Sequence, residues 1–305
     1  MEYRLFSDES KNKTLGGTLY LVTTPIGNMA DITYRAVKVL EEVSFIAAED
    51  TRNTKRLLHY FGISKEVASY HEHNKFSSGS DIVNRLSKGQ SCALVTDAGT
   101  PAISDPGEDL VRLCAKNNIR VTAVPGVSAV VTAVSLSALD THHFMFEGFL
   151  PVQRNDRKKR LEYLKKLSDT IVIYEAPHKL TKTLADIEKE FGNRKISICR
   201  ELTKLNEEVM RVTVSEACEY YQNHEPRGEY VLVIEGACQD ENEDAFWKEM
   251  SVTEHVNHYR DSGMNKNDAI KLVAKERGVP KNAVYNEYVK ANEGKDVKVF
   301  EDLIL

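Results

Sequence analysis

The sequence predicts an α/β protein with two domains and a small helical appendage. Short apolar runs alternate with amphipathic segments from residue 18 to residue 139, as expected for a mostly parallel sheet with helices on both faces. Farther along the chain, alternating apolar and polar positions indicate hairpins and a mixed sheet. An acidic run at residues 240–244 then precedes a helical segment. We therefore expect α/β domains at residues 1–126 and 127–239, a ligand cleft between them, and an appendage at residues 240–305.

The first domain is expected to contain five short buried strands, each followed by a helix. The strands are expected at residues 18–23, 45–48, near Val67, at 92–95 and at 121–124. Asp31 is assigned as the N-cap of the first helix. Further helices are expected through residues 57–58 and 82–86, from Glu108, and from Pro125 to Leu139.

In the second domain, the pattern becomes less regular from Phe144 onward. Helices are expected at residues 154–166 and from Pro177, and strands at 170–174, 196–199, 209–214 and 230–234. In the appendage, residues 268–289 indicate a helix, a turn and a second helix, a unit that can enter a groove of nucleic acid. Because the charges of this segment are nearly balanced, a module that only packs against protein remains an alternative.

The loop after the strand at residues 92–95 is the leading candidate for a small-molecule site. Gly99 lets a ligand approach the backbone, and Pro101 and Pro106 stiffen the loop before the helix that starts at Glu108. Open α/β sheets bind ligands at the carboxyl ends of their strands. An ordinary strand-to-helix turn has no need of two prolines and two acidic residues, so we expect a ligand here.

Composition narrows the classes of protein. The chain has 305 residues, 41% hydrophobic and 29% charged, and its net charge of -5 gives no bulk electrostatic case for nucleic-acid binding. The five cysteines are widely spaced, as is typical of buried thiols in the cytosol. Because we find no signal peptide and no apolar run of membrane length, we expect a cytoplasmic protein without a membrane partner. The His71 and His73 pair has no evident third ligand, so no metal is expected.

Two groups of arginines are candidates for contacts with phosphates. Arg154, Arg157 and Arg160 are spaced to share one face of a basic helix, although such a run is more often a solvated surface. Arg52 stands in the first turn of a helix, where a cation opposes the helix dipole, so an anionic partner is expected. That partner is either Asp50 or a backbone phosphate.

Six motifs in order resemble the RNA-methylating branch of the tetrapyrrole-methylase superfamily. They are TPIGN at residues 24–28, AEDTR at 48–52, TDAGTP at 96–101, SDPG at 104–107, PGVSA at 125–129 and RELTK at 200–204. The resemblance implies S-adenosylmethionine as cofactor and transfer of its methyl group to the ribose 2'-hydroxyl of a cytidine in 16S ribosomal RNA. It also implies a substrate within the 30S subunit and a homodimer.

The resemblance further implies which residues hold the cofactor and take part in the chemistry. The expected cofactor-binding residues are Pro25, Gly27, Asp97, Gly99, Thr100, Pro101, Ile103, Ser128, Ala129 and Tyr174. Carboxylate oxygens suit the neighbourhood of a cationic sulfur, which favours Asp97 there. A ribose hydroxyl is a poor nucleophile and needs a base within hydrogen-bond reach. Asp50, Glu201 and Lys204 are unranked candidates for that base.

Two alternatives remain open from the sequence. The chain could methylate a corrin or sirohaem precursor, because the superfamily shares its fold and cofactor site. The motifs at residues 49–52 and 200–204 favour the RNA branch instead. The second alternative is an RNA-binding assembly factor without activity, which the intact glycine loops disfavour.

Overall fold

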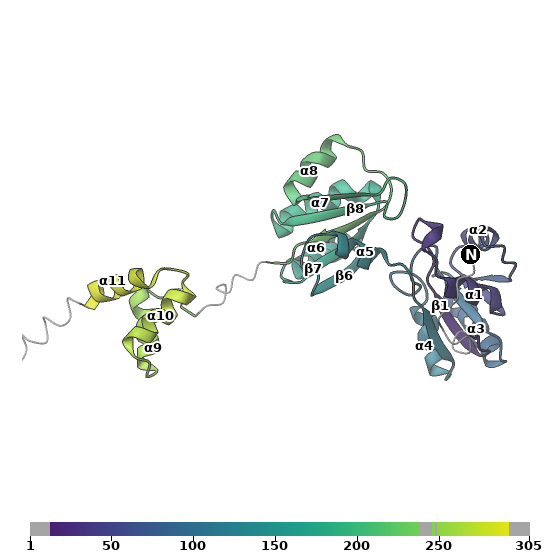
Figure 1. Ribbon diagram of the computed structural model, residues 1–305, viewed down its shortest axis with the longest axis horizontal. Helices are drawn as coiled ribbons and strands as arrows, with labels where there is room; N and C mark the ends of the chain where they lie inside the picture. The colour runs from purple at the N-terminus through teal and green to yellow at the C-terminus, as the bar shows by residue number, and fades with distance from the viewer. Residues whose placement is uncertain (1–12, 238–245, 248, 293–305) are drawn as a thin grey trace, which may run out of the picture. The chain divides into compact units, whose positions relative to one another are not determined.

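The computed structural model describes residues 13–237, 246–247 and 249–292. The chain divides into two compact units, Met1–Ala237 and Cys238–Leu305 (Figure 1). The acidic run at residues 240–244 and the first twelve residues of the polar N-terminal segment lie outside the described residues. The boundaries proposed from the sequence after residues 126 and 239 stay predictions.

The first sheet of the larger unit is entirely parallel. Its strands stand in the order β3-β2-β4-β1-β5, so β4 is the central strand and β1 pairs with β4 on one side and β5 on the other. Their bounds are β1 Thr18–Val22, β2 Phe45–Ala48, β3 Val67–Ser69, β4 Cys92–Val95 and β5 Arg120–Val124. The predicted α/β fold with a parallel sheet is therefore confirmed.

Four helices cover the two faces of this sheet. On one face, Leu40 of α1 (Tyr34–Glu42) and Leu57 of α2 (Thr51–Tyr60) pack against strand residues such as Val22. On the other face, α3 (Lys75–Ser87) and α4 (Glu108–Lys116) cover strand residues such as Phe45. Because the strands are buried on both faces, they read as short unbroken apolar runs in the sequence.

The predicted N-cap of the first helix is wrong by two residues. The side chain of Thr33 caps α1 by accepting a hydrogen bond from the Ala36 backbone N–H at 3.1 Å. Asp31 belongs instead to a short 3-10 turn, Met29–Asp31, which is capped by Asn28. The side chain of Asn28 accepts from the Ala30 N–H, so the chain forms one tight turn before the helix begins.

The second sheet is mixed, as predicted. Its order is β6-β7-β10-β8-β9, in which β6 and β7 are parallel and the other neighbours are antiparallel. The strand bounds are β6 Phe144–Phe149, β7 Thr170–Glu175, β8 Lys195–Arg200, β9 Glu208–Thr213 and β10 Tyr230–Ile234. Alternate residues of a strand face opposite sides, so Ile171 and Ile173 enter one core and Val172 enters the other.

Helices cover both faces of the second sheet as well. One core contains α6 (Arg154–Leu164), α7 (Pro177–Phe191) and α8 (Val214–Asn223). The opposite core contains α5 (Ala129–Leu136), which ends three residues before its predicted end at Leu139. The sequence did not predict α8, whose Thr213 and Glu216 form a capping box.

The smaller unit is a three-helix cluster. It consists of α9 (Val252–Asp261), α10 (Lys266–Glu276) and α11 (Lys281–Asn292) around a core that includes Val256, Ile270 and Val284. The predicted helix, turn and helix correspond to α10 and α11, while α9 was not predicted. Across the described residues, none of these or the other helices has the length and apolarity to cross a membrane.

Each unit has its own apolar core, so removing the smaller unit is expected to leave the larger one folded. A chain that ends at Ala237 should keep the thermal midpoint of the larger unit and the S-adenosylmethionine affinity that the motifs predict for it. Calorimetry on the truncated and full chains measures both quantities. Aggregation of the truncated chain, or loss of cofactor affinity, would show that the unit beyond Ala237 is part of the cofactor-binding structure.

Candidate functional site

Two glycine-containing loops meet at the carboxyl end of the first sheet. Thr24 and Gly99 exchange two backbone hydrogen bonds, of 2.9 Å from Thr24 N to Gly99 O and 3.1 Å in the reverse direction. The Thr24 hydroxyl also donates to the Thr96 carbonyl oxygen at 3.2 Å, and the Thr23 and Thr100 hydroxyls are 3.1 Å apart. These bonds hold the loops after β1 and β4 as one framework at the edge where open α/β sheets bind ligands.

The loop after β4 is held in an unusual backbone conformation. Gly99 has a φ of 82°, a region that costs little for glycine and more for other residues. Ala102 and Ser104 nevertheless adopt φ values of 68° and 59°. Non-glycine residues in this region each cost about 1–3 kcal/mol and gather at ligand sites and switch regions. The conformation therefore supports a binding role for this loop.

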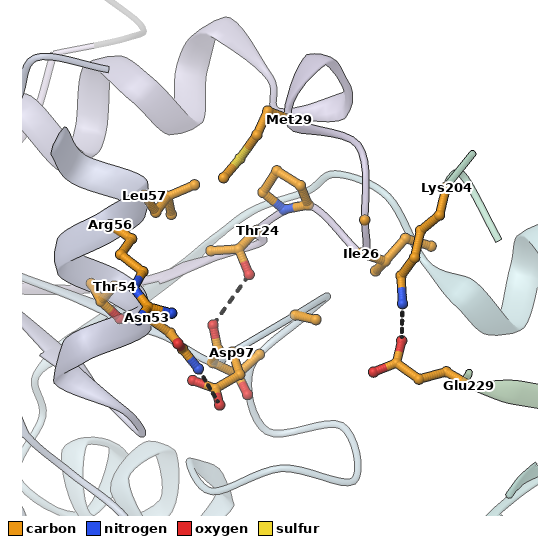
Figure 2. Close-up of a pocket in the computed structure, with 14 residues that line it drawn as sticks. Thr24, Ile26, Met29, Asn53, Thr54, Arg56, Leu57, Asp97, Lys204 and Glu229 are labelled. Carbon is orange, nitrogen blue, oxygen red and sulfur yellow. Dashed lines mark hydrogen bonds and ion pairs between the residues drawn. The ribbon is translucent and has the colours of Figure 1, made fainter. Parts of the chain in front are cut away.

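A cavity of about 310 Å³ lies beside the joined loops (Figure 2). Its walls come from the loop after β1, from α2, from the loop after β4 and from two residues of the second domain. The lining residues are Thr24, Pro25, Ile26, Gly27, Met29, Asn53, Thr54, Arg56, Leu57, Thr96, Asp97, Ala98, Lys204 and Glu229. The cavity thus brings together Pro25, Gly27, Asp97 and Lys204 of the residues predicted from the sequence.

The other predicted cofactor residues occupy neighbouring positions outside this lining. Ser128 caps α5 by accepting from the Val131 N–H, and Ala129 is the first residue of that helix. Tyr174 in β7 packs edge to face on Phe146, with ring centroids 4.9 Å apart. Thr100, Pro101 and Ile103 continue the loop beyond Gly99. The predicted set therefore divides into residues that line the cavity, residues of the loop from Gly99 to Ile103, and residues after β5 and in β7.

Lys204 joins the second domain to the loop after β1. A Cβ atom added to Gly27 would lie 2.5 Å from Cγ of Lys204, so glycine is required for this close approach. The Lys204 ammonium group points at the Glu229 carboxylate (Figure 2), and its Nζ lies 2.9 Å from Oε2 of Glu229. The same nitrogen lies 2.8 Å from Oε1 of Glu201. Burial lowers the pKa of Lys204, but the bonds to Glu201 and Glu229 outweigh burial and raise it.

Lys204 and Glu201, two of the three candidate bases, are held in their charged forms. The hydrogen bond from Lys204 lowers the pKa of Glu201 despite partial burial. Glu201 also accepts from the Glu229 backbone N–H at 2.9 Å, so its oxygens are engaged. A protonated amine cannot accept a proton, and a carboxylate with a lowered pKa is a weak base.

Asp50 pairs with Arg52 in its own turn, which was one of the two partners expected for that arginine. Nε of Arg52 donates to Oδ1 of Asp50 at 3.1 Å and its terminal nitrogen donates to Oδ2 at 2.7 Å. The side-chain hydrogen bond from Arg52, followed by the backbone bond from the same residue, lowers the pKa of Asp50 to about 2. The Arg52 side chain is exposed and that of Asp50 only partly so, which leaves Arg52 accessible to a phosphate that competes with Asp50.

Asp105 differs from those candidates because its pKa is raised toward neutral pH. Burial raises its pKa to about 6, repulsion from Glu49 and Asp97 adds to the rise, and a bond to Thr96 opposes it. Thr96 also donates to Oε2 of Glu49 at 2.9 Å. Partial burial on β7 raises the pKa of Tyr174 to about 12, and the nearby Asp105 adds to the rise. The three carboxylates make this end of the sheet strongly negative.

The arginines predicted to contact RNA are not equally available. Arg157 donates to Asp186 at 2.8 Å and to the Thr183 hydroxyl at 2.9 Å, and Arg160 donates to Glu147 at 2.7 Å. Arg154 makes no ion pair with any described residue. It lines a second cavity, of about 500 Å³, between α6 and α7. The remaining residues of this second cavity include Lys158, Lys182 and Lys189.

The family model for tetrapyrrole (corrin/porphyrin) methylases matches residues 18–218 of this chain. Solved structures agree with that fold. Diphthine synthase superposes with a TM-score of 0.56 at 11% identity, covering 72% of this chain and 90% of the other. Cobalt precorrin-4 methyltransferase superposes with a TM-score of 0.53 at 18% identity, covering 75% and 97%. The chain belongs to the tetrapyrrole methylase family.

Closer relatives fall within one group of that family. The ribosomal RNA small subunit methyltransferase I of Halalkalibacterium halodurans is 48% identical over 273 residues, which are 89% of this chain and 94% of the relative. The protein of the same name from Bacillus subtilis is 46% identical over 274 residues, with the same coverage. The resemblance stated from the motifs is thereby confirmed.

Sequence reasoning missed several residues of the site. Asn53 and Arg56 in α2 and Glu229 before β10 line the cavity but belong to no motif that was assigned a role. Asp105 stood within a quoted motif without being considered as a base. A signal was available for Asn53, which lies one residue beyond the AEDTR motif, whereas Glu229 lies 25 residues from Lys204 and meets it only in the fold.

The contact of Gly27 with Lys204 predicts strong coupling between these positions. Gly27→Ala should lower the free energy of unfolding by about 1–3 kcal/mol, because the new methyl group overlaps the Lys204 side chain. Adding Lys204→Ala to the Gly27→Ala variant should recover part of the lost free energy of unfolding. Urea unfolding of both single variants and the double variant measures the coupling. Additive effects would mean that the two residues do not touch in solution.

The raised pKa of Asp105 predicts a pH-dependent gain in stability from Asp105→Asn. A rise from 3.8 to about 6 corresponds to about 3 kcal/mol, which solvent screening of this half-exposed group reduces to roughly 1 kcal/mol. The folded state binds the proton more tightly, so the charged carboxylate destabilises it above pH 6. Urea unfolding should show the variant more stable at pH 8, with the advantage falling from pH 6 to pH 4. An advantage independent of pH would contradict the assignment.

Proposed function

We propose that this chain transfers a methyl group from S-adenosylmethionine to the ribose 2'-hydroxyl of a cytidine in 16S ribosomal RNA. The relatives at 46–48% identity, which match along 89% of this chain, are the observation that carries the proposal. Lys204 of the motif at residues 200–204 lines the cavity, and so does Asn53, directly after the motif at residues 49–52, which supports the RNA branch over a methylase of tetrapyrroles.

The residues at the joined loops fit a cationic cofactor. S-adenosylmethionine would supply an electrophilic methyl group on a positively charged sulfur. Glu49, Asp97 and Asp105 gather at the carboxyl end of β4. Burial is the main cause of the raised pKa of Asp105, and repulsion from Glu49 and Asp97 adds to it. A nearby positive charge would relieve that repulsion. Gly99, Thr100, Pro101, Ile103, Ser128, Ala129 and Tyr174 would bind the rest of the cofactor.

Asp105 is our candidate for the proton acceptor. A base works best when its pKa lies near the pH at which the enzyme operates, and its pKa of about 6 is suitable. Asp50 and Glu201 have lowered pKa values, and Lys204 is held protonated. We therefore assign Lys204 and Glu201 a positioning role, in which they hold the second domain against Gly27.

The groove between α6 and α7 is proposed to follow the RNA backbone. Arg154, Lys182 and Lys189 line it from two helices and make no ion pair with any described residue. Such cations bind phosphates with release of counterions, whereas Arg157 and Arg160 already neutralise carboxylates of the protein. The proposed RNA contacts therefore differ from the predicted ones. The prediction placed them on one face of α6, and the proposal places them on the two sides of the groove between α6 and α7.

The setting of the reaction is also proposed from the relatives. A ribosomal RNA substrate would place the protein in the cytoplasm and makes the assembled 30S subunit a candidate substrate. A homodimer is expected from the family resemblance and is tested by light scattering at several protein concentrations. The C-terminal unit would then add contacts with the subunit or with a partner chain.

The function is tested by incubating the full chain with methyl-labelled S-adenosylmethionine and either 30S subunits or free 16S RNA. Label in the RNA that resists alkaline cleavage at one cytidine would support the proposal, because a 2'-O-methyl group removes the hydroxyl that attacks the backbone. Cofactor binding without transfer to either RNA would favour the assembly-factor alternative. Transfer to a corrin or sirohaem precursor would favour the tetrapyrrole alternative.

The groove predicts a change in the salt dependence of RNA binding. Replacing Arg154, Lys182 and Lys189 together by Ala should lower the slope of log K against log salt by about 2, since each phosphate contact contributes about 0.7–0.9. S-adenosylmethionine affinity should stay constant. As a control, Lys13, Lys65 and Lys116 replaced by Ala make the same change in net charge elsewhere. An equal fall in slope for both sets would mean that only net charge matters.

A further inference from the structure

The cavity between α2 and the joined loops contains a donor and an acceptor fixed side by side. Nδ2 of Asn53 donates to Oδ2 of Asp97 at 3.1 Å (Figure 2). A carboxylate can only accept, so the amide nitrogen of Asn53 must face Asp97 and its orientation is determined. Asn53 keeps a second N–H and Asp97 keeps a second oxygen for a ligand. The pair therefore offers one donor and one acceptor along a single edge.

This arrangement matches the pairing edge of cytosine. Cytosine carries an amino group, a donor, next to its ring N3, an acceptor. The Asp97 carboxylate would accept from the amino group while the Asn53 amide donates to N3. Uracil has the opposite order, with an acceptor at O4 and a donor at N3, so its O4 would face the Asp97 carboxylate. Such a mismatch leaves both polar groups without partners and repels the ligand.

The size and charge of the cavity fit one pyrimidine nucleotide. Its volume of about 310 Å³ lies at the low end of the range of about 300–1,000 Å³ for ligand pockets. Arg56, one turn from Asn53 on α2, lines the same cavity and makes no ion pair with any described residue. Its guanidinium group is thus available for the phosphate of the same nucleotide. A base must leave its stack to enter such a pocket.

We propose that the Asn53–Asp97 pair in this cavity recognises the base of the target nucleotide and selects cytosine over uracil. The inference rests on the proposed function and deepens it, because it assigns the specificity of the same site to named groups. The adenine of the cofactor presents the same order of donor and acceptor as cytosine. Because Pro25, Gly27 and Asp97, which were predicted to bind the cofactor, line this cavity, the adenine is the competing occupant, and the cofactor affinity of the Asn53 variant distinguishes the two.

Asn53→Asp is the direct test, because it replaces the donor by an acceptor and leaves the size unchanged. The wild-type chain first locates the methylated cytidine in 30S subunits, and subunits are then reconstituted with cytidine or uridine there. The wild-type protein should prefer cytidine by about 10- to 100-fold in kcat/KM, the discrimination expected of a paired donor and acceptor. Asn53→Asp should reduce that preference at least about tenfold, with unchanged S-adenosylmethionine affinity by calorimetry.

Asn84→Asp is the control. Asn84 is an exposed residue of α3, the substitution makes the same change in charge, and the variant should keep the full preference for cytidine. An unchanged preference in Asn53→Asp would overturn the proposal. A loss of cofactor affinity would also overturn it, since the cavity would then hold the adenine of the cofactor. Absence of methylation by the wild-type chain would instead refute the proposed function, and the two failures are therefore distinct.

A binding measurement covers the case in which Asn53→Asp does not fold or is inactive on both substrates. Cytidine 5'-monophosphate should shift the NMR signals of the Asn53 side-chain amide in the wild-type protein, and uridine 5'-monophosphate should bind at least about tenfold more weakly. Asn53→Ala, which removes the donor without adding charge, should reduce the difference between the two nucleotides to the part that the Asp97 carboxylate alone provides. Equal binding of both nucleotides to the wild-type protein would overturn the proposal.

Discussion

The reciprocal backbone hydrogen bonds between Thr24 and Gly99 are the interaction on which the site depends. They join the loop after β1 to the loop after β4, whose strands are neighbours in the parallel sheet. The loop after β1 makes the close contact with Lys204. The loop after β4 contributes the Asp97 and Asp105 carboxylates. Because both bonds are between backbone groups, they constrain loop conformation more than side-chain identity. Gly99 is constrained further by its φ of 82°.

Strain in the backbone is concentrated in the two loops that contribute to this region from opposite domains. Ala102 and Ser104 after β4, and Glu201 and Thr203 after β8, all have positive φ values. In the second loop, Glu201 is held by Lys204 and by the Glu229 N–H, so charged bonds offset part of the strain. The strained turn directs Lys204 across Gly27. Contact between the domains at the site is thus built on local strain that ion pairs compensate.

The sequence predicted the fold well because its strands are short apolar runs that end in glycine loops. The strands at Phe45–Ala48 and Cys92–Val95 were predicted with correct bounds, since burial on both faces leaves no ambiguity in the pattern. The errors come from local competition among polar side chains. Asn28, Asp31 and Thr33 are all good caps, and only the tight turn at Met29 decides that Thr33 starts the helix. The unpredicted α8 and α9 are each short and only partly apolar.

The site was less predictable than the fold because its chemistry depends on which charges neutralise one another. Arg154, Arg157 and Arg160 are equivalent by helical spacing, yet Asp186 and Glu147 neutralise two of them and leave Arg154 for the groove. The candidate bases show the same effect. Asp50 and Glu201 were chosen because motifs contain them, and their ion-pair partners are what makes them weak bases. Burial, followed by repulsion from Glu49 and Asp97, raises the pKa of Asp105, and no cation in the described structure lowers it. A residue in that position keeps a proton affinity useful at neutral pH, and only the folded arrangement of Glu49, Asp97 and Asp105 reveals it.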